Sequence, residues 1–292
     1  TGAERRMTID EDGNVGIGTT VLTYPGLTIN TGGADGGLAI VTTGGYDNKI
    51  YFGDAGDDNI GGISYDHGNN AIYFTVNTAQ GMRIDSNSRI SMSNNDAGDL
   101  NTLFGYNAGL NMHADADSNT FIGHAVGDAS MTATADNNTG VGYIALSSLT
   151  SGKENTAVGA YALLDNASTD FNTAVGVSAG YNTAGSSNTY VGSNSGKGTD
   201  GADTNNVGIG ANSLLAIIAG GYNVILGSSA GTALTDGHNN IAIGSLALST
   251  STSAGLCIAI GDDAMRSGNV TAAADGTIAI GVSALTALTS GQ

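Results

Sequence analysis

The sequence predicts an all-β protein, in which a parallel β-solenoid over residues 99–292 follows a small strand-rich β module over residues 1–98. Three observations predict this fold class. Glycines recur about every 17 residues from Gly105 to Gly281, apolar or β-branched residues hold fixed places before them, and no segment shows the 3.6-residue apolar period of a helix. A period of this length is typical of coils that stack on one another.

The module is predicted from short apolar segments that alternate partly in polarity and are separated by Gly, Asn and Asp turns. This pattern favours antiparallel hairpins or a meander. The turn at Gly68–Asn70, between ISYDH and AIYFTV, is the strongest hairpin signal. Segments 7–17 and 82–92 are similar to one another and indicate two related strand pairs, and residues 93–101 are the expected joint with the solenoid.

The solenoid is predicted to contain about eleven coils, each marked by one glycine. The marker glycines are Gly105, Gly123, Gly142, Gly159, Gly176, Gly192, Gly210, Gly227, Gly244, Gly261 and Gly281. The residue one place before each of them is apolar, and the residue three places before is β-branched. The place four before holds asparagine in nine coils, at Asn101, Asn119, Asn138, Asn155, Asn172, Asn188, Asn206, Asn223 and Asn240.

These columns predict a short strand before each glycine. Side chains alternate along a strand, so the residues one and three places before the glycine share a face. We expect this face to point into the coil, with six stacked threonines, Thr102 to Thr189, buried and bonded along the stack. The glycine would turn the corner, and the asparagines would form an amide ladder. An ice-binding array would instead need the threonines to face water.

Composition and charge limit the partners of the chain. Among 292 residues, 47 are Gly and none is Trp, so a single coil encloses little apolar volume. We expect the remaining apolar stripe to be covered by other copies, in a homotrimer. The net charge of −18 excludes nucleic acid, whose phosphates would be repelled. The longest apolar run, 214–221, is too short for membrane insertion.

No cofactor is predicted, although acidic turns can bind Ca²⁺ through oxygen ligands. The best calcium candidates are Asp10, Asp12, Asp54, Asp57 and Asp58, in the segments DEDGN and GDAGDDN. Neither segment completes a known calcium loop. Most aspartates are expected to cap turns.

The sequence does not predict an enzyme. The four histidines lack the spacing of metal ligands, and Cys257 stands in the asparagine column, where a packing role is expected. A glycosidase would need two carboxylates about 5–10 Å apart. Asp165 with Asp170, or Asp262 with Asp263, are the pairs that could be considered.

Tyrosines recur along the coils, mostly near the corners. One interpretation is packing at the corner. The other is stacking on the sugars of a surface glycan, because tyrosine offers an apolar face and a hydroxyl group. The candidates for glycan binding are Tyr106, Tyr143 and Tyr161.

The coil NNIAIGSLAL at 239–248, with NNVGIGANSL at 205–214 and NTAVGVSAG at 172–180, resembles the head repeat of trimeric autotransporter adhesins. The resemblance covers about residues 101–292 and implies a left-handed parallel β-roll built from three chains. The coils here are longer and less uniform than typical head repeats. LTSGQ at the chain end is similar to LTSGK at 149–153, which leads directly into a coil, so we expect the solenoid to continue beyond residue 292.

The module resembles a different family. KIYFGDAGDDNIGGISYDHGNNAIYFTVN, from Lys49, and RRMTIDEDGNVGIGTT, from Arg5, are similar to segments of bacteriophage tail fibres and related virion appendages. This resemblance implies a trimeric fibre that grips a bacterial host through a surface glycan or protein. We therefore expect an adhesive fibre segment of a virion. The alternatives are the passenger head of a trimeric autotransporter adhesin on a bacterial cell surface, and an extracellular filament with a purely structural role.

Overall fold

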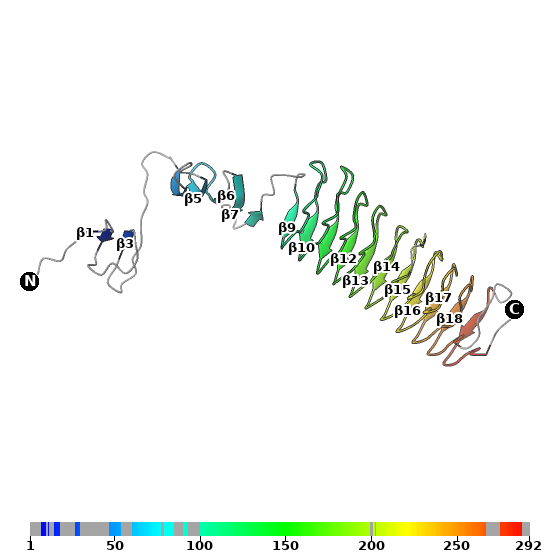
Figure 1. Cartoon of the computed structure of the whole chain (residues 1–292). Helices are drawn as coiled ribbons and strands as arrows, with labels where there is room; N and C mark the ends of the chain where they lie inside the picture. Colours follow the sequence, from blue (N-terminus) through cyan, green and yellow to red (C-terminus); the bar gives the residue numbers. More distant parts are fainter. Residues whose placement is uncertain are drawn as a thin grey trace, which may run out of the picture. The chain divides into compact units, whose positions relative to one another are not determined.

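The structure is a computed structural model, and it describes residues 7–9, 11, 15–17, 27–29, 47–53, 60–76, 79–84, 90–92, 100–198, 201, 203–266 and 275–287. These residues form strands and turns without a helix, which confirms the all-β prediction. Accordingly, none of the described segments is a helix that could span a membrane. The chain divides into two compact units, Thr1–Ile90 and Ser91–Gln292 (Figure 1).

Eight strands precede the solenoid: β1 (Met7–Ile9), β2 (Val15–Ile17), β3 (Leu27–Ile29), β4 (Asn48–Phe52), β5 (Gly61–Asp66), β6 (Ala71–Val76), β7 (Ala79–Ile84) and β8 (Ile90–Met92). In the first sheet, β1 pairs antiparallel with β2, and β2 pairs parallel with β3. The second sheet holds β4 to β8 in chain order and is antiparallel from β4 to β7. The predicted antiparallel meander is therefore confirmed in the second sheet.

The β5–β6 hairpin turns where the sequence predicts, through His67–Asn70. The Asp66 carboxylate accepts hydrogen bonds from the backbone N–H groups of Gly68, at 2.8 Å, and Asn69, at 3.0 Å. A hydrogen bond from the Asn69 side chain, together with these backbone bonds, lowers the pKa of Asp66. The hydrogen bonds that Gly68 and Asn69 donate to Asp66 thus shape the turn, and the turn fixes the register of the two strands.

Eleven three-residue strands form the solenoid: β9 (Thr102–Phe104), β10 (Thr120–Ile122), β11 (Thr139–Val141), β12 (Thr156–Val158), β13 (Thr173–Val175), β14 (Thr189–Val191), β15 (Val207–Ile209), β16 (Val224–Leu226), β17 (Ile241–Ile243), β18 (Ile258–Ile260) and β19 (Ile278–Ile280). They make one parallel sheet in which each strand pairs with the next along the chain (Figure 1). Val158 lies opposite Val175, and Ile243 lies opposite Ile260. The predicted parallel β-solenoid is confirmed.

The marker glycines form a file at the corner where each strand ends. All eleven have a positive φ, between 126° and 149°, which L side chains rarely adopt. A Cβ on Gly159 would also approach the carbonyl oxygen of Gly176, in the next coil, to 2.5 Å. Both the backbone conformation and the spacing between coils therefore require glycine here.

The asparagine column is buried and forms the predicted ladder. The backbone N–H of Asn172 donates to Oδ1 of Asn155 in the preceding coil at 3.0 Å. Nδ2 of Asn155 donates at 2.8 Å to the carbonyl oxygen of Thr169, in the turn that closes its own coil. Each asparagine thus closes one coil and ties it to the next. Cys257 interrupts the side-chain pattern, but its backbone N–H still donates to Asn240 at 3.0 Å.

The strand face that we expected to be buried points outward instead. In β10 to β19 the central residue of each strand is buried, whereas the first and third residues are half-buried or exposed. The buried asparagine explains this, because alternation puts it on the same face as the central residue. The prediction that the Thr102–Thr189 column lies inside the coil is therefore wrong, as is the burial expected for the aliphatic residue before each glycine.

The interior of the solenoid is narrow and holds mostly small side chains. Alanine fills the central position of β12, β13, β17, β18 and β19, and aliphatic residues such as Leu163 enter from the following turns. Tyr190, at the centre of β14, is fully buried and is the largest exception. Gly208 lies opposite it on β15, and a Cβ there would come within 3.1 Å of the Tyr190 ring. A glycine therefore makes room for the large ring.

Candidate functional site

The first candidate surface is the strand face, which we define as the first and third side chains of β9 to β19. The third residue of every strand is apolar, and Phe104, Ile209 and Ile280 are 59%, 40% and 68% exposed. The first residue is threonine from β9 to β14 and valine or isoleucine from β15 to β19. A continuous apolar strip of this kind differs from the scattered apolar residues of an ordinary surface, which makes it a candidate for contact with a partner.

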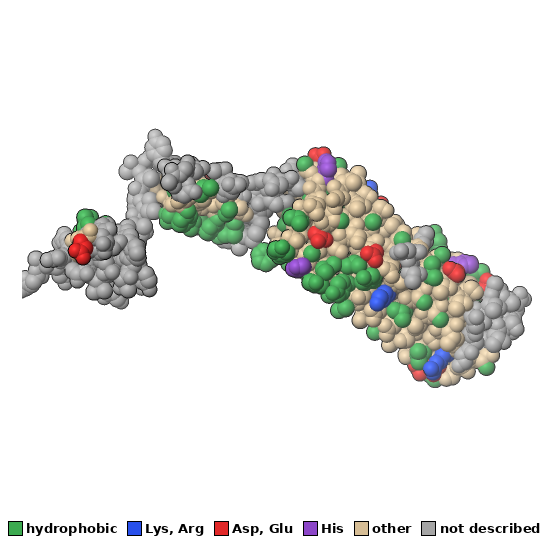
Figure 2. Space-filling model, in the orientation of Figure 1, with side chains coloured by type: hydrophobic (Ala, Val, Ile, Leu, Met, Phe, Trp, Pro, Cys, Tyr) green, Lys and Arg blue, Asp and Glu red, His purple; other side chains and the backbone are tan. Residues whose placement is uncertain are grey.

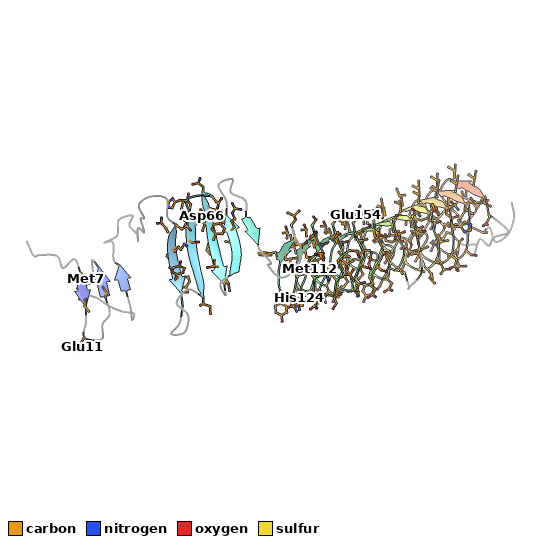
Figure 3. All side chains as sticks on the ribbon, turned by 90° about the horizontal axis from the view of Figure 1, so that it is seen from above. Met7, Glu11, Asp66, Met112, His124 and Glu154 are labelled. Carbon is orange, nitrogen blue, oxygen red and sulfur yellow. The ribbon has the colours of Figure 1, made fainter. Side chains whose placement is uncertain are left out.

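The second candidate surface is the aromatic row, which we define as Tyr106, His124, Tyr143, Tyr161, Tyr181 and Lys197. Each member comes from the turn after one strand, in six successive coils from β9 to β14. Figure 2 shows hydrophobic side chains, with a histidine among them, gathered over the first coils of the solenoid. Figure 3 places His124 on the opposite edge of the coils from Glu154, which precedes β12.

The rings of the aromatic row contact one another along the stack. Tyr106 and His124 are stacked with ring centroids 5.4 Å apart, and His124 and Tyr143 are stacked at 5.2 Å. Tyr161 meets Tyr143 edge to face at 5.4 Å, and Tyr181 follows Tyr161 at 6.5 Å. This arrangement brings together all three tyrosines predicted for glycan binding.

Lys197 ends the row. Its Nζ lies 5.6 Å from the centroid of the Tyr181 ring, as in a cation–π contact. His124, Tyr181 and Lys197 are not among the residues that the sequence predicts to bind a glycan. His124 stands one place after its marker glycine, in the same column as Tyr106 and Tyr143, whereas Tyr181 and Lys197 both stand five places after theirs. The sequence signals that could have found them are the shared column of Tyr106, His124 and Tyr143, and the ring or cation that each successive coil supplies.

A third candidate surface is one face of the second sheet. Alternation and strand register place a set of apolar side chains together there: Ile50, Phe52, Ile63, Tyr65, Ile72, Phe74, Val76, Met82 and Ile84. Arg83 lies on the other face, over the Tyr73 ring at 5.7 Å. The sheet is thus amphipathic.

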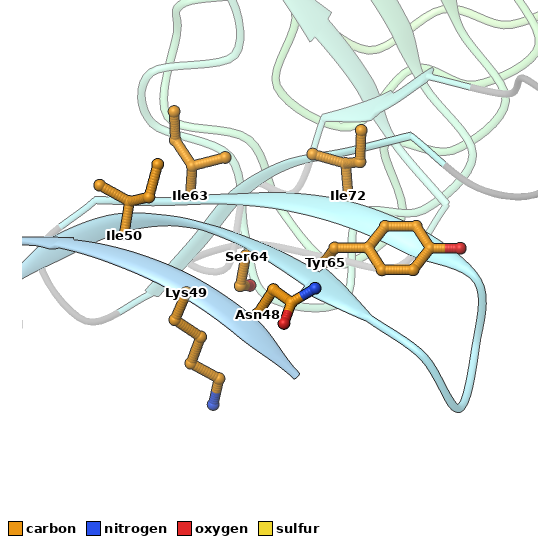
Figure 4. A pocket seen from close by; sticks show the side chains of 7 residues that line it. All are labelled: Asn48, Lys49, Ile50, Ile63, Ser64, Tyr65 and Ile72. Carbon is orange, nitrogen blue, oxygen red and sulfur yellow. The ribbon is translucent and has the colours of Figure 1, made fainter. Parts of the chain in front are cut away.

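A shallow pocket of about 190 Å³ lies against this sheet. Figure 4 shows its seven lining residues, Asn48, Lys49, Ile50, Ile63, Ser64, Tyr65 and Ile72. The three isoleucines point to one side of the sheet, whereas the Lys49 side chain points to the other. The pocket offers apolar contact and no cluster of acid–base groups.

A buried acid lies in the solenoid at β14. The Tyr190 hydroxyl donates a hydrogen bond to the Asp203 carboxylate, and both side chains are removed from solvent. Burial raises the pKa of Asp203 to about 7, against the lowering effect of the Tyr190 hydrogen bond. Burial, with the Asp203 charge beside it, raises the pKa of Tyr190 well above its ordinary value. Because both side chains are buried, at 0% and 2% exposed, we assign the pair to stability.

The carboxylates considered for glycosidase chemistry mostly take part in turn contacts. Asp170 accepts a backbone N–H from the preceding coil at 2.9 Å, and Asp165 accepts a serine hydroxyl at 3.3 Å. Asp263 pairs with Arg266 at 3.1 Å, while its neighbour Asp262 is exposed. These contacts are those of coil-to-coil and turn capping.

The calcium candidates Asp10, Asp12, Asp54, Asp57 and Asp58 all lie outside the described residues. Within the described ranges, no three His, Cys, Asp or Glu side chains gather as a metal site requires. Cys257 is buried, and burial raises the pKa of its thiol. That environment suits the packing role expected from its column.

Comparison with known proteins does not identify the chain. No family model matches it, and no curated protein or solved structure matches it either. The function therefore has to be inferred from the surfaces of the chain itself.

Proposed function

We propose that this chain is a segment of a non-enzymatic, homotrimeric fibre that belongs to a viral appendage and attaches it to a bacterial host surface. The observation that carries the proposal is the uncovered strand face of β9 to β19. A strip of Thr, Val, Ile, Phe and Leu side chains along eleven strands is favourably buried against another surface. The same strip on another copy of the chain has the matching apolar character.

The charge of the chain supports self-association through this face. Each copy carries a net charge of −18, which opposes the approach of another copy. The strand face holds no charged side chain, so copies can meet there without bringing their carboxylates together. The resemblance of the coils to heads of trimeric adhesins favours three copies. The apolar face of β4 to β7 gives the module a second surface for the same assembly.

Two other functions share this assembly. The passenger head of a bacterial adhesin would present the same solenoid at a cell surface, and a structural filament would present it without a ligand. The resemblance of the segments at Arg5 and Lys49 to tail-fibre sequences favours the virion. Adsorption of the purified chain to bacterial cells separates an attachment role from a structural one, because a filament without a ligand would not adsorb.

Light scattering of the full chain tests the assembly. We expect a mass of about 86 kDa, three times 28.8 kDa. The double variant Val175→Asp/Ile243→Asp puts two charges on the strand face and is expected to dissociate the assembly. The matched control Ser228→Asp/Ser245→Asp puts the same charges on exposed turn positions and should leave it intact. A folded wild-type chain of 28.8 kDa would refute the proposed trimer.

A further inference from the structure

The aromatic row is not needed to fill the core of the solenoid. The core consists of the central strand residues and the aliphatic side chains of the turns, and no member of the row belongs to it. Tyr106 is 71% exposed, Tyr143 45% and Tyr161 36%. The rings already contact one another on a regular parallel scaffold. A ligand therefore has little side-chain freedom left to remove when it binds. The row is therefore a preformed surface.

The row and the strand face are formed by different segments of each coil. Members of the row follow the corner glycines, whereas the strand face lies before them. Covering the strand face with another copy does not by itself cover the row. Self-association and ligand binding can thus take place on the same chain.

We propose that the aromatic row binds a neutral polysaccharide chain that lies along the coil stack, a proposal that rests on the attachment role above and names its ligand class. Tyrosine combines apolar ring surface with a hydroxyl group, which suits the C–H and O–H groups that a sugar ring presents. His124 and Lys197 add donors at two further points of the row. Successive ring contacts span 5.2 to 6.5 Å, so the row repeats along one line.

This repetition favours a polymer over a small ligand. Six successive coils contribute one member each, at the strand spacing of about 4.8 Å per coil. A single sugar could contact only one or two members. A linear glycan can contact several weak sites at once, and its affinity then rises with the number of sites engaged.

The charge of the chain decides between neutral and acidic glycans. The net charge of −18 repels polyanions, and the row itself holds a single lysine to offset that repulsion. A neutral polysaccharide avoids this cost. A protein partner is the competing occupant of an exposed aromatic surface, and the experiment below distinguishes it.

Binding of purified neutral polysaccharides tests the proposal. The full chain is immobilised, and dextran, galactomannan and a panel of neutral bacterial capsular polysaccharides are titrated, with hyaluronate and heparin as acidic controls. We expect at least one neutral polysaccharide to bind and both acidic ones to fail. The triple variant Tyr106→Ala/Tyr143→Ala/Tyr161→Ala should lose affinity by about tenfold or more.

Two variants control for structure. The triple Tyr→Phe variant at the same positions keeps the rings and should lose only about threefold. Tyr222→Ala removes a tyrosine that is 62% exposed outside the row and should bind as the wild type does. Circular dichroism verifies that each variant is folded. Unchanged binding by the folded triple alanine variant would overturn the proposal.

Other outcomes are also decisive. A wild-type chain that binds no polysaccharide of the panel, while the triple alanine variant no longer adsorbs to bacteria, would assign the row to a protein partner and overturn the glycan proposal. Light scattering on the same samples separates the two proposals. A monomer that binds polysaccharide contradicts only the trimer, whereas a trimer that binds none contradicts only the glycan site.

Discussion

The first six coils and the last five share one backbone and differ in what they present outward. Strands β9 to β14 begin with threonine and are followed by the turns that carry the aromatic row, whereas β15 to β19 begin with valine or isoleucine. Beyond Lys197 the sequence contains only two further ring residues of these types, Tyr222 and His238. The corner glycines continue unchanged through both parts. The inward and corner positions set the fold, and the outward positions are free to differ.

This difference suggests that the last five coils serve self-association and the first six coils serve ligand binding. The apolar columns of β15 to β19 are better suited to hold copies together, because burial of valine and isoleucine is more favourable than burial of threonine. The first six coils combine a more polar strand face with exposed aromatic side chains, which suits ligand binding. Tyr190 and Asp203 lie at the change from one part to the other, in the coil of β14 and the loop that follows it.

The largest expected effect is at this change between the two parts. Tyr190→Ala should lower the free energy of unfolding by about 3–5 kcal/mol, because it opens a cavity and leaves the buried Asp203 without its donor. Tyr222→Ala, an exposed control in the last five coils, should change it by less than about 0.5 kcal/mol. Urea unfolding monitored by circular dichroism measures both. Equal effects would show that Tyr190 is not a core residue.

Asp203 makes this region sensitive to pH. Its pKa is about 7 in the folded chain and about 3.8 when unfolded, so the folded state binds the proton more tightly. The stabilisation is complete below about pH 3.8 and is lost as pH rises through 7. The difference of 3.2 pKa units (7 − 3.8) corresponds to a loss on the order of 4 kcal/mol across this window.

The variant Asp203→Asn isolates this effect. The amide oxygen can still accept the Tyr190 hydroxyl, but it has no proton to lose. The difference in unfolding free energy between wild type and variant should therefore change between pH 4.5 and pH 8, with the variant relatively more stable at the higher pH. A difference that stays constant with pH contradicts the raised pKa of Asp203.

A charge on the strand face should matter more in the last five coils. Ile243→Asp places a carboxylate beside Ile241, whereas Val158→Asp places one beside Thr156, which keeps that part of the face more polar. Sedimentation should show half-dissociation at a concentration about tenfold higher for Ile243→Asp than for Val158→Asp. Equal dissociation would remove the proposed difference between the two parts.

The smallest expected effect is on self-association, when threonines on the strand face of the first six coils are replaced by the valine found in the last five. Thr156→Val/Thr173→Val should strengthen self-association by about 0.5–1 kcal/mol per copy, because it replaces hydroxyl groups with methyl groups on the covered face. Thr134→Val, at an exposed turn position, serves as the control and should have no effect. Weaker association of the double variant would indicate that the threonines bind water or a ligand instead.

Much of the fold could be predicted because the repeat makes its constraints visible. The file of glycines and the file of asparagines predict the strand positions, the corner and the ladder. The direction of the strand face was predicted wrongly, since period 2 allows either face to be inside. Valine and isoleucine are usually buried, and this preference favours the strand face that in fact points outward. Asn155 and its equivalents are buried because they hydrogen-bond within and between coils. Their burial determines which face of each strand points inward.

The candidate site was predicted only in part. Tyr106, Tyr143 and Tyr161 were singled out by their residue type. Tyr181 and Lys197 stand five places after their corner glycines, whereas the three predicted tyrosines stand one or two places after theirs. Only the three-dimensional structure therefore shows that they belong to the same row. The pairing of Tyr190 with Asp203 spans a loop, and nothing in the repeat columns indicates it.

The most direct test of the central claim is whether the strand face is covered in solution. Val175 is 37% exposed in a single chain, so a cysteine in its place would react readily with a maleimide if the chain stayed alone. In the assembled fibre we predict that Val175→Cys is protected, like the buried Cys257, while Ser228→Cys on an exposed turn is labelled rapidly. Labelling of Val175→Cys as fast as Ser228→Cys would contradict self-association through this face.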